Sequence, residues 1–331
     1  MQSQGSILLH YANDQQMEVL TKQARPEEMH DMMRAMQRKV MRIIAKDDAA
    51  YPELLRHIPD APPLLFYIGD LRALAGQKYV TMVGSRKASF SGLDATRRIA
   101  RDLSRYGVSI VSGLAVGVDA AAHEGCLEGG SATIGVAACG LDVDYPAENA
   151  ALKRRILRSG GILLSEAPPG TPALPWRFPV RNRILAGLSS ATIMMEARLR
   201  SGTMTTIQHA LDQGREVYAY PGDPNAPSAD AARSLLREGA NYFTSAKDIL
   251  EDMKWTSTKA APKLKEQERP DLPELDEEAQ TIYDLLGRGE QSFDQLAAGS
   301  GLDAQVISGA LTMLQIYGLI RTLPGKLYKR V

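Results

Sequence analysis

The sequence is poor in the features that mark membrane, secreted and metal-binding proteins. Its 331 residues include only 2 cysteines, Cys126 and Cys139, and no set of histidines and cysteines has the spacing of a metal site. No apolar run approaches the ~18 residues of a membrane span, and the first residues lack the basic stretch and cleavage site of a signal peptide. We therefore expect a cytoplasmic protein without a disulfide framework, a metal or a membrane partner.

Net charge is also absent, because 39 basic side chains balance 39 acidic ones. The balance is uneven along the chain: residues 78–250 carry 20 basic and 16 acidic side chains, whereas residues 251–331 carry 10 and 13. Neutrality thus excludes a broadly basic coat but not a local site for a polyanion, which only clustering of charge can reveal.

Short apolar runs alternate with helix-length stretches from about residue 79 onward. The runs are Val80–Val83, Val108–Val111, Ala132–Ala137, Gly161–Leu164, Thr192–Met195 and Glu216–Ala219. Continuous apolar runs separated by helical stretches are typical of a parallel sheet that helices cover on both faces. The pattern predicts an α/β domain over residues 46–253.

The flanking regions have other patterns. Residues 1–45 read as a short, Met-rich N-terminal helical segment, and the polar, Pro-containing residues 254–271 read as a linker. Residues 272–331 show three helical patterns followed by a hairpin, which predicts a C-terminal winged-helix domain. Its last helical pattern, Asp303–Ile316, contains no Arg or Lys, so we expect a protein-contact or regulatory role rather than reading of DNA bases.

Glycines and small polar residues follow the first two apolar runs of the predicted sheet. Gly84-Ser85-Arg86-Lys87 follows the first run, and Ser112-Gly113 with Gly117 follows the second. Free amides at such turns, beside a basic side chain, suit a phosphate. The first turn is not GxGxxG, and the second run ends without the acidic residue that would hold a ribose, so the pattern does not favour NAD.

Basic and aromatic residues gather further along the chain, in Arg177-Phe178 and Arg181-Asn182-Arg183. Guanidinium groups neutralise phosphates and aromatic rings stack on bases, a combination suited to single-stranded nucleic acid. A helix start whose arginines pair with nearby carboxylates fits the same residues, and Ser201-Gly202-Thr203 favours an anion site. All these segments fall at strand-to-helix turns and converge on one edge of the sheet.

Asp119 and His123 are four residues apart and share one helix face. The spacing fits either a structural hydrogen-bonded pair or an acid–base pair. Because the sequence offers no nucleophile or metal-ligand set, the structural role is favoured. No catalytic residue and no cofactor are assigned.

Taken together, these motifs resemble the DNA-processing protein A family (DprA, also called Smf) over about residues 46–252. Further pieces of the resemblance are Tyr51-Pro52 through Gly69, Gly140-Leu141-Asp142, Tyr145-Pro146, Ser165-Glu166, Glu196-Ala197, Pro221-Gly222 and Gly239-Ala240. The resemblance implies an extended Rossmann-type domain that binds single-stranded DNA without base preference and forms homodimers. It also implies that the protein protects incoming DNA and loads the RecA recombinase on it during natural transformation.

By the same resemblance the strand lies over the edge of the sheet, with Phe178 as a candidate stacking ring. The residues expected to bind DNA are Gly84, Ser85, Arg86, Lys87, Ser112, Gly113, Gly117, Arg177, Phe178, Arg181, Asn182, Arg183, Ser201, Gly202 and Thr203. Asp119, His123 and Glu196 are expected to support the structure. The chain departs from the family pattern where Val116 replaces a frequent Arg and where Ala231 and Arg233 replace a usual Gly and Asn.

The runner-up hypothesis is an enzyme of the nucleotide-cleaving Rossmann type, a nucleoside-monophosphate phosphoribohydrolase. The same phosphate loops and Glu196 motivate it. Such enzymes carry a PGGxGTxxE motif, of which this sequence retains only Ser201-Gly202-Thr203, without a Glu three residues after Thr203. A third hypothesis, a sequence-specific regulator that acts through the winged helix, is disfavoured by the uncharged last helix.

Overall fold

The computed structural model describes residues 41–76, 78–222, 229–256, 275, 277–287, 289–316, 319–323 and 327–330. The chain divides into two compact units, Met1–Pro262 and Lys263–Val331. The division falls within the predicted linker. Residues 1–40 of the predicted N-terminal helical segment, and residues 257–271 of the linker, lie outside the described residues.

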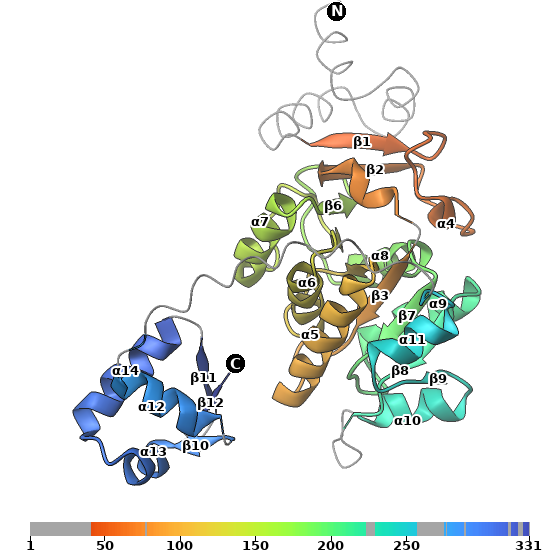
Figure 1. Cartoon of the computed structure of the whole chain (residues 1–331). Helices are drawn as coiled ribbons and strands as arrows, with labels where there is room; N and C mark the ends of the chain where they lie inside the picture. The colour runs from red at the N-terminus through yellow and green to blue at the C-terminus, as the bar shows by residue number, and fades with distance from the viewer. Residues whose placement is uncertain are drawn as a thin grey trace, which may run out of the picture. The chain divides into compact units, whose positions relative to one another are not determined.

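The described part of the first unit is built on a nine-stranded sheet with the order β1-β2-β6-β5-β4-β3-β7-β8-β9 (Figure 1). Its strands are β1 (Arg42–Ala45), β2 (Leu64–Gly69), β3 (Tyr79–Val83), β4 (Ser109–Ser112), β5 (Ile134–Val136), β6 (Ile162–Ser165), β7 (Ala191–Met194), β8 (Glu216–Ala219) and β9 (Asn241–Tyr242). From β6 to β9 the neighbouring strands pair in parallel, whereas β2 pairs antiparallel with both β1 and β6.

Helices cover both faces of the sheet (Figure 1). One face carries α5 (Phe90–Arg105), α6 (Val118–Gly129), α7 (Ala150–Arg158) and α11 (Ala246–Asp252), and the other carries α4 (Glu53–Arg56), α8 (Arg177–Gly187), α9 (Gly202–Asp212) and α10 (Asp230–Arg237). Alternate side chains of β3 enter two separate cores, Val80 and Met82 with α5 and α6, and Tyr79 and Val83 with α8 and α9. This two-sided burial explains why the strands read as continuous apolar runs.

The predicted α/β fold class is confirmed, because β3 to β8 coincide with the six apolar runs. The antiparallel strands β1 and β2 extend this sheet at one edge. β1 lies at residues 42–45, which the sequence pattern assigned to the N-terminal helical segment.

The chain reverses its direction of progress across the sheet at β3, which pairs with β4 on one side and β7 on the other. In open α/β sheets, ligands bind in the crevice that forms at the carboxyl ends of strands at such a switch point. The loops after β3 and β7 therefore lie together, and the Ser85 amide donates to the Glu196 carbonyl oxygen over 2.6 Å.

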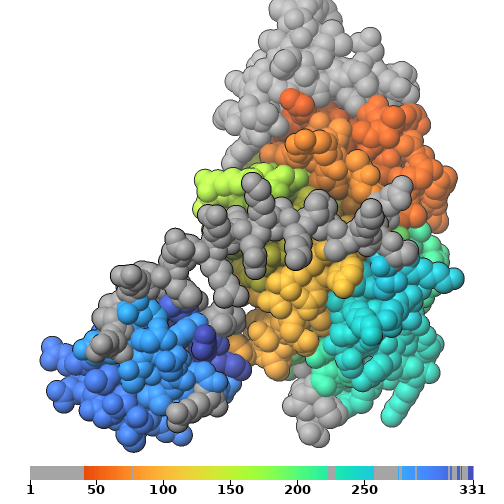
Figure 2. All heavy atoms as spheres, in the orientation of Figure 1, coloured from red at the N-terminus to blue at the C-terminus, as the bar shows by residue number. Residues whose placement is uncertain are grey.

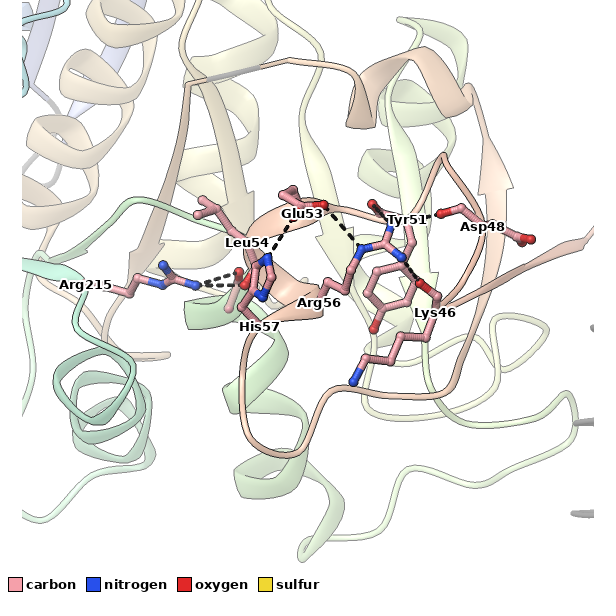
Figure 3. A network of polar contacts seen from close by, with 9 residues as sticks. Lys46, Asp48, Tyr51, Glu53, Leu54, Arg56, His57 and Arg215 are labelled. Carbon is pink, nitrogen blue, oxygen red and sulfur yellow. Dashed lines mark hydrogen bonds and ion pairs between the residues drawn. The ribbon is translucent and has the colours of Figure 1, made fainter.

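A polar network fixes the segment between β1 and β2 to the parallel part of the sheet (Figure 3). The Arg56 guanidinium lies over the Tyr51 ring, 5.5 Å from its centroid, and donates to the carbonyl oxygens of Lys46, Asp48 and Tyr51. Arg215, which precedes β8, donates to the Leu54 carbonyl oxygen over 2.9 Å. The antiparallel edge and the parallel sheet thus form one structural unit.

The second unit contains, among its described residues, the helices α12 (Glu277–Leu286), α13 (Phe293–Ser300) and α14 (Ala304–Ile316) and the strands β10 (Gln291–Ser292), β11 (Ile320–Leu323) and β12 (Leu327–Arg330). The strands form an antiparallel sheet in the order β10-β12-β11. Ile282, Leu296 and Leu314 are buried at the centre of the three helices. This arrangement confirms the predicted winged helix.

Candidate functional site

The loop between β3 and α5 lies at the carboxyl edge of the sheet. Gly84 packs against α6 and the Glu196 carbonyl so closely that a Cβ there would clash with both. The Ser85 carbonyl oxygen accepts a hydrogen bond from the first residue of α6 over 3.2 Å. Two anchors therefore hold the backbone of the loop, while the side chains of Arg86 and Lys87 remain exposed.

Glu196 occupies the N-terminus of α5. Its carboxylate accepts hydrogen bonds from the Ser89 amide, 3.1 Å from each oxygen, and from Ser89 Oγ over 2.7 Å. Ser89 Oγ in turn accepts from the Gly92 amide over 3.0 Å. Because the first amides of a helix attract anions, the chain's own carboxylate fills the position that a phosphate would take.

The turn between β4 and α6 is built around the buried carboxylate of Asp119. Its Oδ2 accepts from the amides of Gly113 and Ala115 over 3.0 and 3.3 Å. Burial raises the pKa of Asp119, and the Arg181 guanidinium and the two amides oppose that rise. The amides that the sequence offered to a phosphate thus bind a side chain of the protein.

Backbone conformation holds the same turn in place. Gly117 has a φ of +85°, and a Cβ there would clash with the backbone of Ser85 and Arg86. Ser112 Oγ is fully buried and donates to the Met82 carbonyl oxygen over 2.7 Å. The turn therefore needs glycine at position 117 in order to pack against the loop after β3. Val116 of the same turn is half-buried.

Arg181 lies beneath the turn and is only 7% exposed. Its guanidinium donates to the carbonyl oxygens of Gly113, over 2.9 Å, and of Val136. Burial lowers the pKa of Arg181 to about 10, and the nearby Asp119 opposes the change. The side chain joins the ends of β4 and β5, so its hydrogen bonds go to the protein.

The two residues after Arg181 point elsewhere. Asn182 is buried and donates from Nδ2 to the Gly202 carbonyl oxygen over 3.2 Å, which ties α8 to the start of α9. Arg183 forms a two-pronged ion pair with Glu166 over 2.9 and 2.6 Å, and its Nε donates to the Asp60 carbonyl oxygen over 3.0 Å. Arg183 therefore shows the carboxylate pairing that the sequence left open.

Exposed and half-buried basic and aromatic side chains gather at the same edge of the sheet. The Arg86 guanidinium lies over the Phe178 ring, 5.1 Å from its centroid, and the Tyr145 ring lies 5.5 Å from that of Phe178 at a 56° tilt. Arg177 lies over Trp176, 4.5 Å from the ring centroid, and Trp176 is 58% exposed. We call these five residues the aromatic–basic rim.

Two polar side-chain atoms at the starts of α8 and α9 have no hydrogen-bond partner in the described part of the chain. They are Nε of Arg177 and Oγ of Ser201. Ser201 is the N-cap residue of α9, yet its side chain makes no capping bond. Gly202 is exposed and Thr203 is buried. A buried polar atom without a partner costs free energy, and the start of a helix such as α9 is suited to an anion.

His123 and Asp119 do not pair with each other within the described structure. His123 Nδ1 lies 2.7 Å from Thr133 Oγ1, which donates to the Ile110 carbonyl oxygen. The imidazole is fully buried, and burial lowers the pKa of His123 to about 3. It is thus a neutral core residue at physiological pH.

Two further features, a metal-binding cluster and a membrane-spanning helix, are absent from the described ranges. No group of three or more His, Cys, Asp or Glu side chains there could hold a metal ion. No helix in those ranges is both long enough and apolar enough to span a bilayer.

Sequence reasoning missed three contributors to the site. Tyr145 and Glu166 appeared only as parts of the resemblance, although both follow strands and so fall at the carboxyl edge. Trp176, which directly precedes Arg177-Phe178 in the sequence, was not assigned a role. The signal for all three was their position at a strand-to-helix connection, which is where this fold brings side chains together.

Comparison with known proteins identifies the family. The family model for DNA recombination-mediator protein A matches residues 42–254, and the DprA winged helix domain matches residues 266–326. The chain belongs to the DNA recombination-mediator protein A family. This confirms the resemblance inferred from the sequence motifs.

Two relatives illustrate the extent of the likeness. Protein Smf of Synechocystis is 35% identical over 329 residues, which cover 89% of this chain and 81% of the relative. DNA processing protein DprA of Streptococcus pneumoniae is 42% identical over 208 residues, which cover 63% of this chain and 73% of the relative.

Solved structures of the family share the fold. The structure of DprA from Streptococcus pneumoniae aligns with a TM-score of 0.64 and 38% identity over 70% of this chain and 78% of that one. A structure of DNA processing protein A from Helicobacter pylori, described in terms of its single-stranded DNA binding mode, aligns with a TM-score of 0.57 and 27% identity over 65% of this chain and 95% of that one.

Proposed function

We propose that this chain is a non-enzymatic single-stranded DNA-binding protein that protects incoming DNA and loads the RecA recombinase on it during natural transformation. The observation that carries the DNA-binding part is the placement of Arg86 over Phe178 at the carboxyl edge of the sheet. There a charge for a phosphate and a ring for a base lie within reach of one nucleotide.

The chemistry of the rim fits a single strand without sequence preference. Arg86, Lys87 and Arg177 supply positive charge for phosphates, and Phe178 and Trp176 supply rings on which bases stack. Stacking on a ring is tolerant of sequence because every base has a π-face. A duplex hides those faces, so this surface favours single strands.

The remaining predicted site residues divide into two roles. Ser201, with its unpaired hydroxyl, and the exposed Gly202 extend the anion site at the start of α9. The others shape the edge from below, through the bonds described above: Gly84, Ser85, Ser112, Gly113, Gly117, Asp119, His123, Arg181, Asn182, Arg183, Glu196 and Thr203.

Recombination and assembly belong to the same proposal. The family is described as a recombination mediator, and this description supports RecA as the partner. The proposal includes a homodimer and a cytoplasmic location. Sedimentation of the purified chain tests the dimer, and RecA filament formation on DNA coated with single-strand-binding protein tests the loading step.

The nucleotide-cleaving alternative has little support from the site. Glu196, the carboxylate that motivated it, is bound to Ser89 at the start of α5. The position three residues after Thr203 is Thr206, which is buried. Release of free adenine from AMP by the purified protein would establish this enzyme activity and overturn the non-enzymatic assignment.

A salt titration tests DNA binding directly. We expect a labelled dT30 strand to bind much more tightly than a 30-base-pair duplex, with log K falling linearly as log salt rises. Arg86→Ala should weaken binding to dT30 and lower the slope by about 0.7 per lost phosphate contact. The matched control is Arg237→Ala, which removes another exposed charge, from the last residue of α10.

The control variant should bind dT30 as the parent protein does. Equal affinity of the parent protein for single and double strands would contradict the proposal. So would unchanged binding by Arg86→Ala in a protein whose melting temperature is also unchanged.

A further inference from the structure

A strongly basic helix, α7, lies on the same face of the sheet as α6 (Figure 1). Its nine residues include Lys153, Arg154, Arg155 and Arg158, and the sequence has no acidic residue between Glu148 and Glu166. Part of this helix is visible in yellow-green at the surface in Figure 2. This concentration of charge stands out in a chain with no net charge.

The three arginines of α7 face away from the core. Leu152 and Ile156 are the buried residues of the helix, whereas Arg154, Arg155 and Arg158 are exposed. At 3.6 residues per turn the arginines fall within about 100° of one another, with Arg154 and Arg158 on the side away from the buried pair and Arg155 beside it. Among the described residues, none of the three has a carboxylate within the 4.0 Å of an ion pair.

One hydrogen bond connects α7 to the aromatic–basic rim, and a second connects the residue before α7 to the turn after β4. Lys153 Nζ donates to the carbonyl oxygen of Tyr145 over 2.7 Å, and the Tyr145 ring contacts Phe178 beneath Arg86. Asn149, just before α7, donates to the carbonyl oxygen of Leu114 over 2.9 Å, in the turn after β4. The start of α7 is therefore held at the carboxyl edge, next to the proposed DNA site.

The direction of α7 gives the surface its geometry. In a parallel α/β unit the connecting helix runs antiparallel to the strands, so α7 leads from the carboxyl edge down the flank of the domain. Arg154 and Arg158 are four residues apart, a rise of about 6 Å along the helix. Charges at that spacing can each meet a different phosphate of the same strand.

We propose that the exposed arginines of α7 form a second contact for single-stranded DNA, which holds the strand after it leaves the rim. This inference rests on the proposed function and extends the same site by several nucleotides. The ligand chemistry is that of a phosphate backbone, because α7 presents charge without an exposed aromatic ring on which a base could stack.

Helix stability offers a competing reason for two of these charges. Arg155 and Arg158 lie in the last turn, where basic side chains interact favourably with the helix dipole. The test must therefore separate charge from structure. Triple replacement of Arg154, Arg155 and Arg158 by Gln removes the charge, and triple replacement by Lys retains it as a matched control.

Strand length separates this contact from the rim. We expect the Gln variant to weaken binding of dT30 about tenfold and to lower its salt slope by about 2, the value for three phosphates on a single strand. Binding of dT6, measured by competition, should be unchanged because six nucleotides are held at the rim. The Lys variant should bind dT30 as the parent protein does.

Each outcome bears on one proposal. Unchanged dT30 binding by the Gln variant, with Arg86→Ala weakening both strands, overturns the α7 contact and leaves the rim standing. A Lys variant as weak as the Gln variant also overturns it, since charge would then not be the cause. Failure of the parent protein to bind either strand overturns the proposed function itself. Equal melting temperatures of the three proteins confirm that folding is intact.

Discussion

The guanidinium of Arg86 and the ring of Phe178 lie 5.1 Å apart, although the chain between them forms three strands of the sheet. A cation over an aromatic face at an exposed position contributes about 0.5–1 kcal/mol. The pair is thus a weak contact energetically, but it places a charge and a stacking surface at one point. Four predictions follow from this site and from the groups beneath it.

Phe178→Leu should weaken binding of dT30 without altering its salt slope. The ring offers a stacking surface worth about 1–3 kcal/mol per base, whereas leucine retains the apolar volume but no π-face. Fluorescence anisotropy at several salt concentrations measures both quantities. Phe178→Tyr retains the ring and should bind as the parent does, and a leucine variant with full affinity would exclude stacking at this position.

Arg181→Ala should destabilise the domain rather than act on DNA directly. Removing the buried guanidinium leaves the carbonyl oxygens of Gly113 and Val136 without their donor, which costs about 1–3 kcal/mol, and it also removes the positive charge near Asp119. Urea unfolding measures the loss. Arg86→Ala, at an exposed position, loses only the contact with the Phe178 ring and should change the free energy of unfolding by no more than about 1 kcal/mol. Equal stability of the two variants would show that Arg181 is not part of the framework.

Two serines in turns at the same edge of the sheet should behave in opposite ways. Ser112→Ala loses the buried hydrogen bond to the Met82 carbonyl, which costs about 1 kcal/mol of stability. Ser201→Ala removes a hydroxyl without a partner in the described structure, so stability should not fall while dT30 binding weakens. Thermal unfolding and anisotropy on both variants check this. Reduced stability of Ser201→Ala together with full DNA affinity would contradict the anion role.

Acid should destabilise the first unit through His123. The folded pKa of about 3 lies below the ordinary value of 6.5, so between these values the unfolded chain binds a proton that the folded chain does not. The contribution of neutral His123 to the free energy of unfolding is fully present above pH 6.5. It is lost as the pH falls toward 3, by about 1.4 kcal/mol per pH unit. Urea unfolding at pH 7, 6 and 5 measures the slope.

The matched variants for this prediction are His123→Gln and His57→Gln. The first should have a shallower dependence of unfolding free energy on pH. The second removes an exposed imidazole that contacts Glu53 and serves as the control for a histidine outside the core. If both variants keep the parent slope, another group is responsible for acid sensitivity.

Much of the fold follows from the sequence, for a definite physical reason. Strands β3 to β8 are buried on both faces, and this leaves continuous apolar runs whose alternation with helix-length stretches indicates parallel strands. The antiparallel strand β1 left no such signal, because it directly follows a segment of helical pattern. The position of β1 in the sheet depends on its pairing with β2. The two strands are near in sequence, but their sequence patterns do not indicate the pairing.

The site was predictable in its location but not in the direction of its side chains. The turns after β3, β4 and β7 meet because parallel strands end at one edge. Arg181 and Arg183, however, look alike in sequence, and a rotation of about 100° per residue points them to different parts of the protein. Only the packing of α8 shows that one binds carbonyl oxygens under the turn and the other binds Glu166.

The carboxylates of Glu196 and Asp119 have a consequence for how a strand would move. Because these carboxylates accept hydrogen bonds from backbone amides at the two turns, the edge offers few rigid sites that would hold a phosphate in one position. Long side chains such as Arg86 and Lys87 contact the DNA backbone instead, and they can change rotamer as it moves. A strand displaced by one nucleotide then meets the same chemistry as before, so lateral diffusion along DNA should encounter only low barriers.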